Sequence, residues 1–411
     1  MKVLVLNCGS SSVKFQLVAT EPKDEATAAE QTLARGLIEN IGGTAVVKYD
    51  RPGQRTLRET DDILEHKVAV ERAIALLTDP AHGVIADRAE IAAVGHRVVH
   101  GGERFKTSVR IDDDVLEGIE ACFDMAPLHN PPNVRGYRAA HAVLSSVPHV
   151  AVFDTSFHQT MPPEAYVYGL PYALYQRHGI RRYGFHGTSH RFVSRRLAAL
   201  LGRSPEDPEL RVITCHLGNG CSLAAIRGGR SVDTSMGFTP LEGLVMGTRC
   251  GDVDPAALLH VVAREEIGSA EVNALANKHS GLLGISGLSH DMRTLLEAEG
   301  QGNDRAKLAI DVFCYRLRKY VAAYLGALGG ADAIAFAGGI GENAAAVRSR
   351  GLFGLEALGV ALEPAANAAA LGSEAEISPA GARTRVFVVP TNEELLIARD
   401  TARIVNGLLP A

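Results

Sequence analysis

Short apolar runs of the strand type, each ending in a polar turn that contains glycine, mark this chain from its first residues. The runs Val3–Leu6 and Val13–Val18 flank the loop Asn7–Ser12, which offers a glycine, three hydroxyls and an amide, and Lys14 follows. Exposed backbone N–H groups, hydroxyls and a nearby cation bind anions, so the stretch predicts a hairpin with a phosphate-binding loop. Because Asn, Gly and Ser are also common turn residues, an ordinary hairpin turn is the alternative.

The same pattern returns in the middle of the chain, over Val212–Ile226. An apolar run reaches His216, the turn Gly218–Gly220 comes next, and a second apolar run continues. In this alignment the equivalent positions are Asn7 and His216, Gly9 and Gly218, and Ser10 and Asn219. Two such hairpins, each opening one half of the chain, predict a duplicated domain with one phosphate loop from each half.

The rest of the first half alternates between strand and helix patterns. Ile91–His100 is expected to be a strand that carries Arg97, and His149–Phe153 a buried strand that ends at Asp154. An acidic residue after a buried strand serves a metal or catalytic role, or acts as the N-cap of the next segment. Helices are expected over Asp62–Leu77, over Asp112–Met125, and from the turn His129–Asn133 to about Ser145.

Two histidines on the Arg97 strand, His96 and His100, have the spacing of two ligands on a helix. On a strand, however, residues four apart lie about 13 Å from each other, so one metal ion does not reach both. We therefore expect these histidines to be structural.

A third histidine, His186, lies between Gly184 and Gly187, where no packing demand explains an imidazole. Thr188 or Ser189 is expected to cap a helix that runs to Leu200. His186 is therefore a candidate functional residue, whereas His190, inside the helix, is expected to be structural.

Further along, Arg249 is flanked by glycines just before a helix expected to start at Asp254. An arginine at the surface is usually solvated, but this rigid frame favours anion binding. A long helix over Ala306–Leu328 precedes a strand, Ala333–Ala337, that runs into the glycine-rich turn Gly338–Ala344.

The last helix comes after a strand over Arg385–Val389. Thr391 and Glu394 have the spacing of a capping box. Glu393 is then left without a capping role, and its carboxylate serves either the helix dipole or a metal ion.

Composition excludes several classes of protein. A chain of 411 residues with 46% hydrophobic residues indicates at least two globular domains. A net charge of −5 and the absence of Trp argue against nucleic-acid binding. The six scattered cysteines indicate free thiols in a reducing compartment, and no apolar run is long enough to span a bilayer. We therefore expect a cytoplasmic protein without a membrane partner.

A dinucleotide site is the main rival hypothesis. Gly339–Ala344 matches G-x-G-x-x-A after a strand, and Glu363 has a spacing that suits the ribose-binding acid of an NAD-dependent oxidoreductase. Too few residues remain after this turn for a complete dinucleotide fold, and this hypothesis leaves both hairpin loops unexplained.

Two halves with hairpin phosphate loops and a late strand leading into a GGxG turn have the layout of the actin-like ATPase superfamily. The motifs LNCGSSSVKF, GHRVVHGGE, FDTSFH, YGFHGTSH, HLGNGCS, DTSMGFTPLEGLVMGTRCGDVDP, AFAGGIGEN and TNEEL, in this order, closely resemble the acetate kinase family. The resemblance implies an α/β fold of two duplicated actin-like (ribonuclease H-like) domains with a cleft between them. It places them at residues 1–153 and 154–390, with the terminal helix, residues 391–411, packing back on the first.

The same resemblance implies the reaction and the cofactors. ATP and acetate would give ADP and acetyl phosphate, with Mg²⁺, or Mn²⁺ in its place, as the metal, in a homodimer. The implied catalytic residues are Arg97, Asp154, His186 and Arg249, and the implied Mg²⁺ positions are Asn7 and Glu393. The implied nucleotide-binding residues are Lys14, His216, Leu217, Gly218, Asn219, Gly220, Asp291, Met292, Arg293, Gly338, Gly339, Ile340, Gly341, Glu342 and Asn343. The implied substrate residues are Arg97 and the apolar positions Val99, Leu128, Phe185 and Pro240.

Related functions stay open at this point. A kinase of propionate or another short-chain acid has the same motifs, and the sequence leaves the direction of flux and the phosphoryl donor open. An actin-like filament or an Hsp70-like binding protein would use the same ATP loops, but it would have no need for His186 and two framed arginines.

Overall fold

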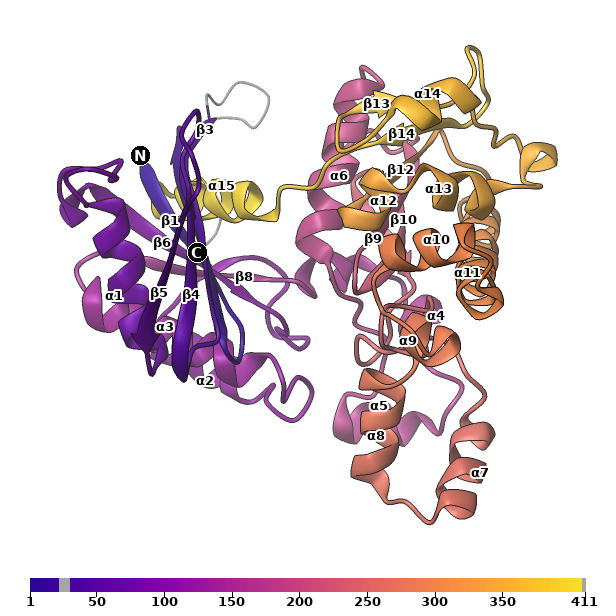
Figure 1. Cartoon of the computed structure of the whole chain (residues 1–411), viewed down its shortest axis with the longest axis horizontal. Helices are drawn as coiled ribbons and strands as arrows, with labels where there is room; N and C mark the ends of the chain where they lie inside the picture. The colour runs from indigo at the N-terminus through magenta and orange to yellow at the C-terminus, as the bar shows by residue number, and fades with distance from the viewer. Residues whose placement is uncertain (22–29, 409–411) are drawn as a thin grey trace. The chain divides into compact units, whose positions relative to one another are not determined.

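The computed structural model describes residues 1–21 and 30–408 of the chain. These residues form two compact units: unit 1 is Met1–Phe157 with Asn392–Ala411, and unit 2 is His158–Thr391. Residues 409–411 of the expected terminal helix lie outside the described residues. Each unit is an α/β structure built on a single sheet (Figure 1).

Unit 1 is built on an eight-stranded sheet in the order β5-β4-β3-β2-β1-β6-β8-β7. Antiparallel pairing joins β1 to β2, and parallel pairing joins β1 to β6 and β6 to β8. The strands are β1 (Lys2–Cys8), β2 (Ser12–Thr20), β3 (Glu30–Glu39), β4 (Gly43–Asp50), β5 (Leu57–Ile63), β6 (Ile91–Val98), β7 (Val109–Arg110) and β8 (His149–Phe153). The helices are α1 (His66–Leu77), α2 (Asp113–Glu120), α3 (Asn130–Val143) and α15 (Glu393–Val405).

Side chains of β1 alternate between the two faces of this sheet, and both faces are buried. Leu4 and Leu6 pack in the core that α1 and α3 complete, whereas Val3 and Val5 pack in the core that α15 completes. This period of two explains why β1 is apolar at every position from Val3 to Leu6. A Cβ on Gly95 of β6 would lie 2.5 Å from Thr401 Oγ1, so the close approach of α15 requires glycine there.

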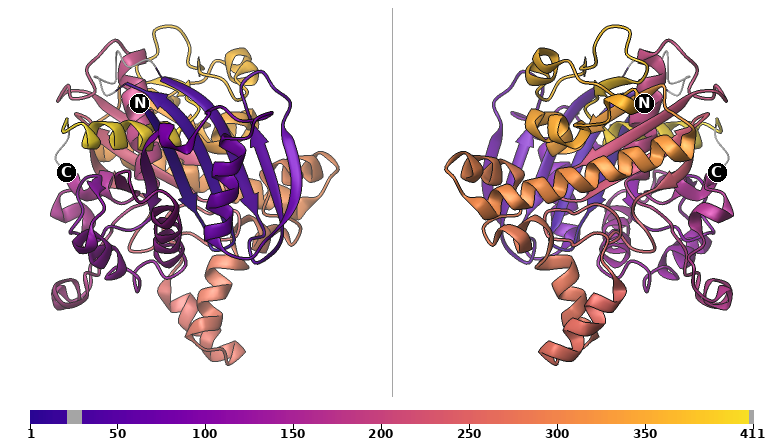
Figure 2. Two further views of the ribbon diagram at one scale, coloured as in Figure 1. Left: turned by 90° about the vertical axis from the view of Figure 1, so that its left-hand side faces the viewer. Right: turned by 90° about the vertical axis from the view of Figure 1, so that its right-hand side faces the viewer.

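Unit 2 is built on a six-stranded sheet in the order β11-β10-β9-β12-β14-β13. The strands are β9 (Arg211–Leu217), β10 (Cys221–Arg227), β11 (Arg230–Thr234), β12 (Ala333–Ala337), β13 (Ala375–Glu376) and β14 (Arg385–Val388). The helices are α4 (Pro163–Tyr166), α5 (Tyr172–His178), α6 (Gly187–Leu200), α7 (Pro255–Glu265), α8 (Ser269–Lys278), α9 (Gly281–Ser286), α10 (Met292–Gly300), α11 (Asp304–Leu328), α12 (Gly338–Asn343), α13 (Ala345–Leu352) and α14 (Pro364–Ala369). Helix α6 covers one face of the sheet and the long α11 the other, and α7 and α8 extend away from it (Figures 1 and 2).

The two sheets repeat one plan, which confirms the predicted duplication. In unit 2, β9 pairs antiparallel with β10 and parallel with β12, and β12 pairs parallel with β14. The hairpins also share their register at the turn. Asn7 pairs with Lys14 one residue before the last pair of its hairpin, and His216 pairs with Ser222 at the equivalent place.

Several expected element boundaries are wrong. Residues Leu57–Ile63 form the edge strand β5, paired with β4, so the first helix starts at His66 and not at Asp62. Asp112 is the N-cap of helix α2. The helix ends at Glu120, five residues earlier than expected. Pairing and packing partners that are distant in sequence set these limits, and local pattern does not reveal them.

Two expectations about the chain as a whole can be checked. All six cysteines are free, as expected. None of the helices within residues 1–21 and 30–408 has the length and apolar character needed to cross a membrane.

Candidate active site

The loop after β1 is held in a tight turn by its own backbone and by α3. Gly9 N donates to Ser12 O at 2.8 Å, which closes the turn. Asn133 of α3 donates through Nδ2 to Cys8 O at 2.8 Å and accepts at Oδ1 from Val99 N at 3.1 Å. Asn133 thereby ties the end of β1 to the end of β6, which carries Arg97. Sequence reasoning missed it because it lies in the proline-rich turn that begins α3.

Arg97 and Asp154 meet at neighbouring strand ends in unit 1. Arg97 Nε lies 3.1 Å from both Asp154 oxygens, and Nη2 lies 2.5 Å from Oδ2. Glu393 is a second carboxylate near Arg97, with Oε2 3.7 Å from Arg97 Nε. Burial alone lowers the pKa of Arg97, but the Asp154 and Glu393 carboxylates outweigh it and raise the pKa above its ordinary value. The guanidinium is therefore permanently charged and fixed in orientation.

The start of α15 differs from the expected capping box. Asn392 is the N-cap, with Oδ1 accepting from Leu395 N at 3.1 Å. Glu394 forms an ion pair with Lys14, so the capping interaction of Thr391 with Glu394 is absent. Lys14, the cation expected beside the phosphate loop, is therefore already paired with a carboxylate.

Glu393 fits a cation site by its surroundings. Burial raises the pKa of Glu393 above its ordinary value, and the negative charges of Asp154 and Glu394 raise it further. The positive charge of Arg97 lowers the pKa but does not cancel the increase. A bound cation would relieve that repulsion. Mg²⁺ takes oxygen ligands, often one or two carboxylates with waters and substrate phosphates. No cluster of three or more His, Cys, Asp or Glu residues with metal-site geometry occurs in the described parts of the chain, so any Mg²⁺ here would depend on nucleotide oxygens.

His186 of unit 2 has an unusual backbone conformation. It is the N-cap of α6 with φ +56° and ψ +25°, a left-handed conformation that is costly for a residue with a side chain. The helix begins at Gly187, so Thr188 and Ser189 are not its caps, contrary to expectation. The His186 ring stacks on His216 with centroids 4.3 Å apart, and its Nδ1 lies 2.8 Å from Ser222 Oγ.

Arg249 adjoins His186 at Gly220, in the loop between β9 and β10. A Cβ on Gly220 would lie 3.4 Å from both Arg249 Nη1 and His186 Nε2. Arg249 Nη1 also donates to Pro240 O at 3.0 Å, and burial lowers the Arg249 pKa. The backbone around Arg249 is held by the start of α9: Ser280 N donates to Thr248 O and Leu282 N to Met246 O.

A cavity of about 700 Å³ in unit 2 is lined in part by this loop between β9 and β10. Gly218 and Asn219 form one wall, and the start of α10 and helix α12 form the others. Helix α12 directly follows β12, where the sequence predicted a glycine-rich turn. The structure thus brings together many of the expected nucleotide residues from three separate segments. The lining residues are Gly218, Asn219, His290, Asp291, Met292, Arg293, Leu296, Gly339, Ile340, Asn343 and Ala344.

A sequence model of the Acetokinase family matches residues 2–399 of the chain. The chain belongs to the acetokinase family. It is 52% identical over 407 residues to the acetate kinase of Methanosarcina barkeri, which covers 99% of this chain and 97% of that one. The crystal structure of Porphyromonas gingivalis acetate kinase superposes with a TM-score of 0.92 at 45% identity, covering 98% and 99% of the two chains. A propionate kinase from Francisella tularensis superposes with a TM-score of 0.88 at 42% identity, covering 97% and 98%. The two duplicated units are the actin-like fold of this family.

Some residues expected at the nucleotide support the backbone of the acetokinase fold. Glu342 Oε1 accepts from Gly338 N at 2.8 Å and from Thr391 N at 3.1 Å. The fully buried Arg348 donates to Gly341 O and Glu342 O, two carbonyl groups of α12. Leu217 is buried in β9. These residues support α12 and β9 and are absent from the cavity wall.

The dinucleotide hypothesis loses its key residue in this structure. Glu363 is the N-cap of α14, with Oε1 and Oε2 accepting from Ala365 N and Ala366 N. A carboxylate used for capping is not the ribose-binding acid that the hypothesis requires.

The remaining expected residues can be placed within their units. His96 and His100 are buried, as expected of structural residues. Val99 is buried in unit 1, where Leu128 is 60% exposed. In unit 2 Phe185 is buried directly before His186, and Pro240 is half-buried beside Arg249.

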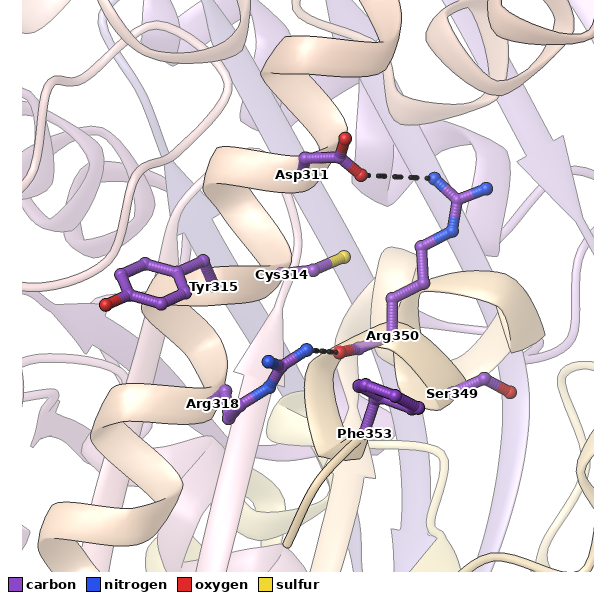
Figure 3. A pocket seen from close by; sticks show the side chains of 7 residues that line it. All are labelled: Asp311, Cys314, Tyr315, Arg318, Ser349, Arg350 and Phe353. Atoms are coloured by element: carbon purple, nitrogen blue, oxygen red, sulfur yellow. Dashed lines mark hydrogen bonds and ion pairs between the residues drawn. The ribbon is translucent and has the colours of Figure 1, made fainter.

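A second cavity of unit 2, about 460 Å³, lies between α11 and α13 (Figure 3). None of the expected site residues lines it. Arg350 pairs with Glu299 at 2.8 Å and approaches Asp311 at 3.7 Å, and Arg318 donates to Arg350 O at 2.7 Å. Its arginines therefore join helices to one another, which is a structural role.

Proposed function

We propose that this chain transfers the γ-phosphoryl group of ATP to acetate and forms acetyl phosphate and ADP. One observation carries the proposal beyond family membership: the loop Gly218–Gly220 lines the 700 Å³ cavity on one side and adjoins His186 and Arg249 on the other. A nucleotide held in that cavity would reach this loop with its phosphates, because exposed backbone N–H groups bind phosphate. The transferring phosphoryl group would then meet an imidazole and a guanidinium.

The chemistry requires little from the protein beyond position and positive charge. Acetate is ionised at neutral pH and needs no general base. One of its oxygens bonds to the γ-phosphorus while the bond from that phosphorus to the bridging oxygen of ADP breaks. Charge on the transferring group is stabilised by donors that are already in place. In unit 2 these donors are Arg249 and His186.

Unit 1 supplies the groups that we assign to the carboxylate substrate and to Mg²⁺. Arg97, whose Nε and Nη2 bind Asp154, would bind the carboxylate of the substrate with its remaining guanidinium N–H groups. Asn7 and Glu393 would hold Mg²⁺, or Mn²⁺ in its place, which neutralises phosphate charge when bound. We also propose that the two compact units are the two functional domains, and that Val99, Leu128, Phe185 and Pro240 contact the substrate methyl group.

A propionate kinase is the second candidate, because a solved propionate kinase has 42% identity and the same fold. The two acids differ by one methylene group, which a pocket distinguishes by only about 1–3 kcal/mol.

Trapping the acyl phosphate tests the proposed function. With ATP, Mg²⁺ and hydroxylamine, the purified chain should form acyl hydroxamate, fastest with acetate, and slower with propionate and butyrate. A higher kcat/KM for propionate would reassign the substrate. Failure to form hydroxamate from any of the three acids would overturn the function itself.

We propose a cytoplasmic homodimer, which the family resemblance implies and which six free cysteines suit. Helix α7 offers the surface for a second copy: it is rich in apolar residues and none of them is buried, Leu259 being 69% exposed. Light scattering should show a dimer for the wild type and a monomer for Leu259→Glu. Leu308→Glu, at an exposed position of α11, is the matched control and should stay dimeric. A monomeric wild type would refute the proposal.

A further inference from the structure

A chain of hydrogen bonds runs from the interior of unit 2 to His186. Thr214 Oγ1 lies 2.7 Å from His190 Nδ1, and His190 Nε2 lies 2.8 Å from Ser222 Oγ. Ser222 Oγ in turn lies 2.8 Å from His186 Nδ1. Thr214, His190 and Ser222 are at most 1% exposed, so water does not share these contacts.

The number of protons on each side chain determines which group donates and which accepts in each hydrogen bond. The Ser222 hydroxyl has one proton and lies between two imidazole nitrogens, so it donates to one and accepts from the other. The Thr214 hydroxyl has no hydrogen-bond partner other than His190 among residues 1–21 and 30–408. If it accepted from His190, its own proton would be buried without an acceptor, which is unfavourable.

Thr214 therefore donates to His190 Nδ1, which leaves the proton of His190 on Nε2. That N–H donates to Ser222 Oγ, and the Ser222 proton goes to His186 Nδ1. Burial, with His158 and His216 nearby, keeps the pKa of His190 well below its ordinary value, so His190 is neutral as this order requires. His186 Nδ1 is an acceptor, and its proton is on Nε2, the atom next to Gly220 and Arg249.

We propose that Thr214, His190 and Ser222 are positioning residues that hold His186 as a neutral imidazole with its N–H on Nε2. His186 is then a hydrogen-bond donor toward an anion, and neither a general base nor a second cation beside Arg249. The nature of that anion, a transferring phosphoryl group, rests on the proposed function. The left-handed backbone of His186 places its ring where Ser222 can reach it.

Nitrogen NMR of the full-length chain with ¹⁵N-labelled histidine reads the tautomer directly, without any activity. His186→Gln identifies the His186 signals among the 15 histidines. In the wild type at neutral pH, His186 should be protonated on Nε2 only. In Ser222→Ala the Nδ1–H form should appear. Thr214→Val, which keeps the shape but removes the hydroxyl, should shift His186 in the same direction, and Thr214→Ser should restore it.

The same variants have a kinetic signature in the hydroxamate assay. Ser222→Ala should lower kcat by about tenfold to a hundredfold, as outer partners of functional histidines do, with the KM for ATP almost unchanged. The matched control is Ser231→Ala: Ser231 is also fully buried and its hydroxyl lies 2.8 Å from the Nδ1 of a buried histidine, His158. Ser231→Ala should change neither the His186 signals nor kcat relative to the wild type.

Three results would overturn the inference: a wild-type His186 protonated on Nδ1, an unchanged tautomer and kcat in Ser222→Ala, or an equal loss of kcat in Ser231→Ala. If the wild type forms no hydroxamate, the proposed function fails. The NMR spectra still decide whether Thr214, His190 and Ser222 fix the tautomer of His186.

Discussion

The two site arginines differ in the groups that surround their charge. Arg97 is held between two carboxylates, Asp154 and Glu393. Arg249 forms no ion pair with any carboxylate in the described residues; it donates to Pro240 O and lies 3.7 Å from Met246 Sδ. Burial of an uncompensated charge is costly, which is why its pKa is lowered. We propose that a phosphate oxygen of the nucleotide is the anionic partner of this guanidinium.

Arg249→Lys should lower kcat by about 10²–10³, the usual loss for one preorganised donor, with a smaller change in the KM for ATP. Lysine keeps the charge but loses the planar fork. The measurement is steady-state kinetics of hydroxamate formation. Arg305→Lys is the control, because Arg305 also donates to a backbone carbonyl, Ile285 O, away from the cavity. A large rise in KM with kcat intact would make Arg249 a ground-state clamp instead.

Local context determines which site residues could be predicted from sequence. Glycines on both sides made His186 and Arg249 conspicuous, because neither position has a packing explanation. Ser222 and Asn133 carry no such signal: a serine in an apolar strand and an asparagine in a turn are common. Their importance comes from partners such as His190 and Cys8, which only the folded chain brings near.

At the scale of elements, the start of α15 combines a capping residue with the residue that we propose for the metal site. Asn392 caps the helix, and Glu393, the next residue, approaches Arg97. Asn392→Ala should lower the free energy of unfolding by about 1 kcal/mol and leave the Mg²⁺ requirement unchanged. Glu393→Gln should raise the Mg²⁺ concentration needed for half-maximal activity and leave the melting temperature nearly unchanged.

Glu394→Gln is the control for this division of roles. It removes an ion pair with the half-exposed Lys14, a contact worth at most about 1 kcal/mol, and should change neither quantity much. Urea unfolding and Mg²⁺ titrations measure both effects. If Asn392→Ala and Glu393→Gln shifted the Mg²⁺ requirement equally, the division would be wrong.

Strongly patterned elements could be predicted from the sequence, whereas partner-dependent boundaries could not. Both hairpins, the strand over Ala333–Ala337 and the helix that ends at Leu328 are present as expected. The strand β5 is polar and half-exposed, and its pairing with β4 alone makes it a strand. The capping box failed because Thr391 and Glu394 both have other partners.

At the scale of the whole molecule, duplication distributes the chemistry over two similar sheets. The hairpin after β1 and the hairpin after β9 occupy equivalent places, which the repeated sequence pattern was sufficient to predict. Their surroundings have diverged. Unit 1 places carboxylates and Arg97 near its loop, whereas unit 2 places histidines and a cavity near its own.

Unit 1 also contains a buried histidine pair that couples its stability to pH. His149 Nε2 lies 3.1 Å from Leu144 O, a carbonyl that only accepts, so His149 Nε2 donates. Its Nδ1 then accepts from His96 Nε2 at 2.8 Å. Protonation of His149 on Nδ1 would remove this acceptor and break the contact with His96. Burial lowers the pKa of His149 to about 4 and that of His96 well below its ordinary value. Burial also lowers the pKa of His100, another histidine of unit 1, to about 4.

Acid should therefore destabilise unit 1. Above about pH 6.5 these histidines are neutral in both the folded and the unfolded chain and add no pH dependence. Below that pH the unfolded chain binds protons that the folded chain excludes, so the free energy of unfolding should fall toward pH 4, by up to about 1.4 kcal/mol per pH unit for each histidine. Hydrogen exchange of β6 and β8 amides at pH 7, 6 and 5 measures this slope. His96→Gln should reduce it, whereas His260→Gln, on exposed α7, should not. An unchanged slope in His96→Gln would show that other groups govern the acid sensitivity.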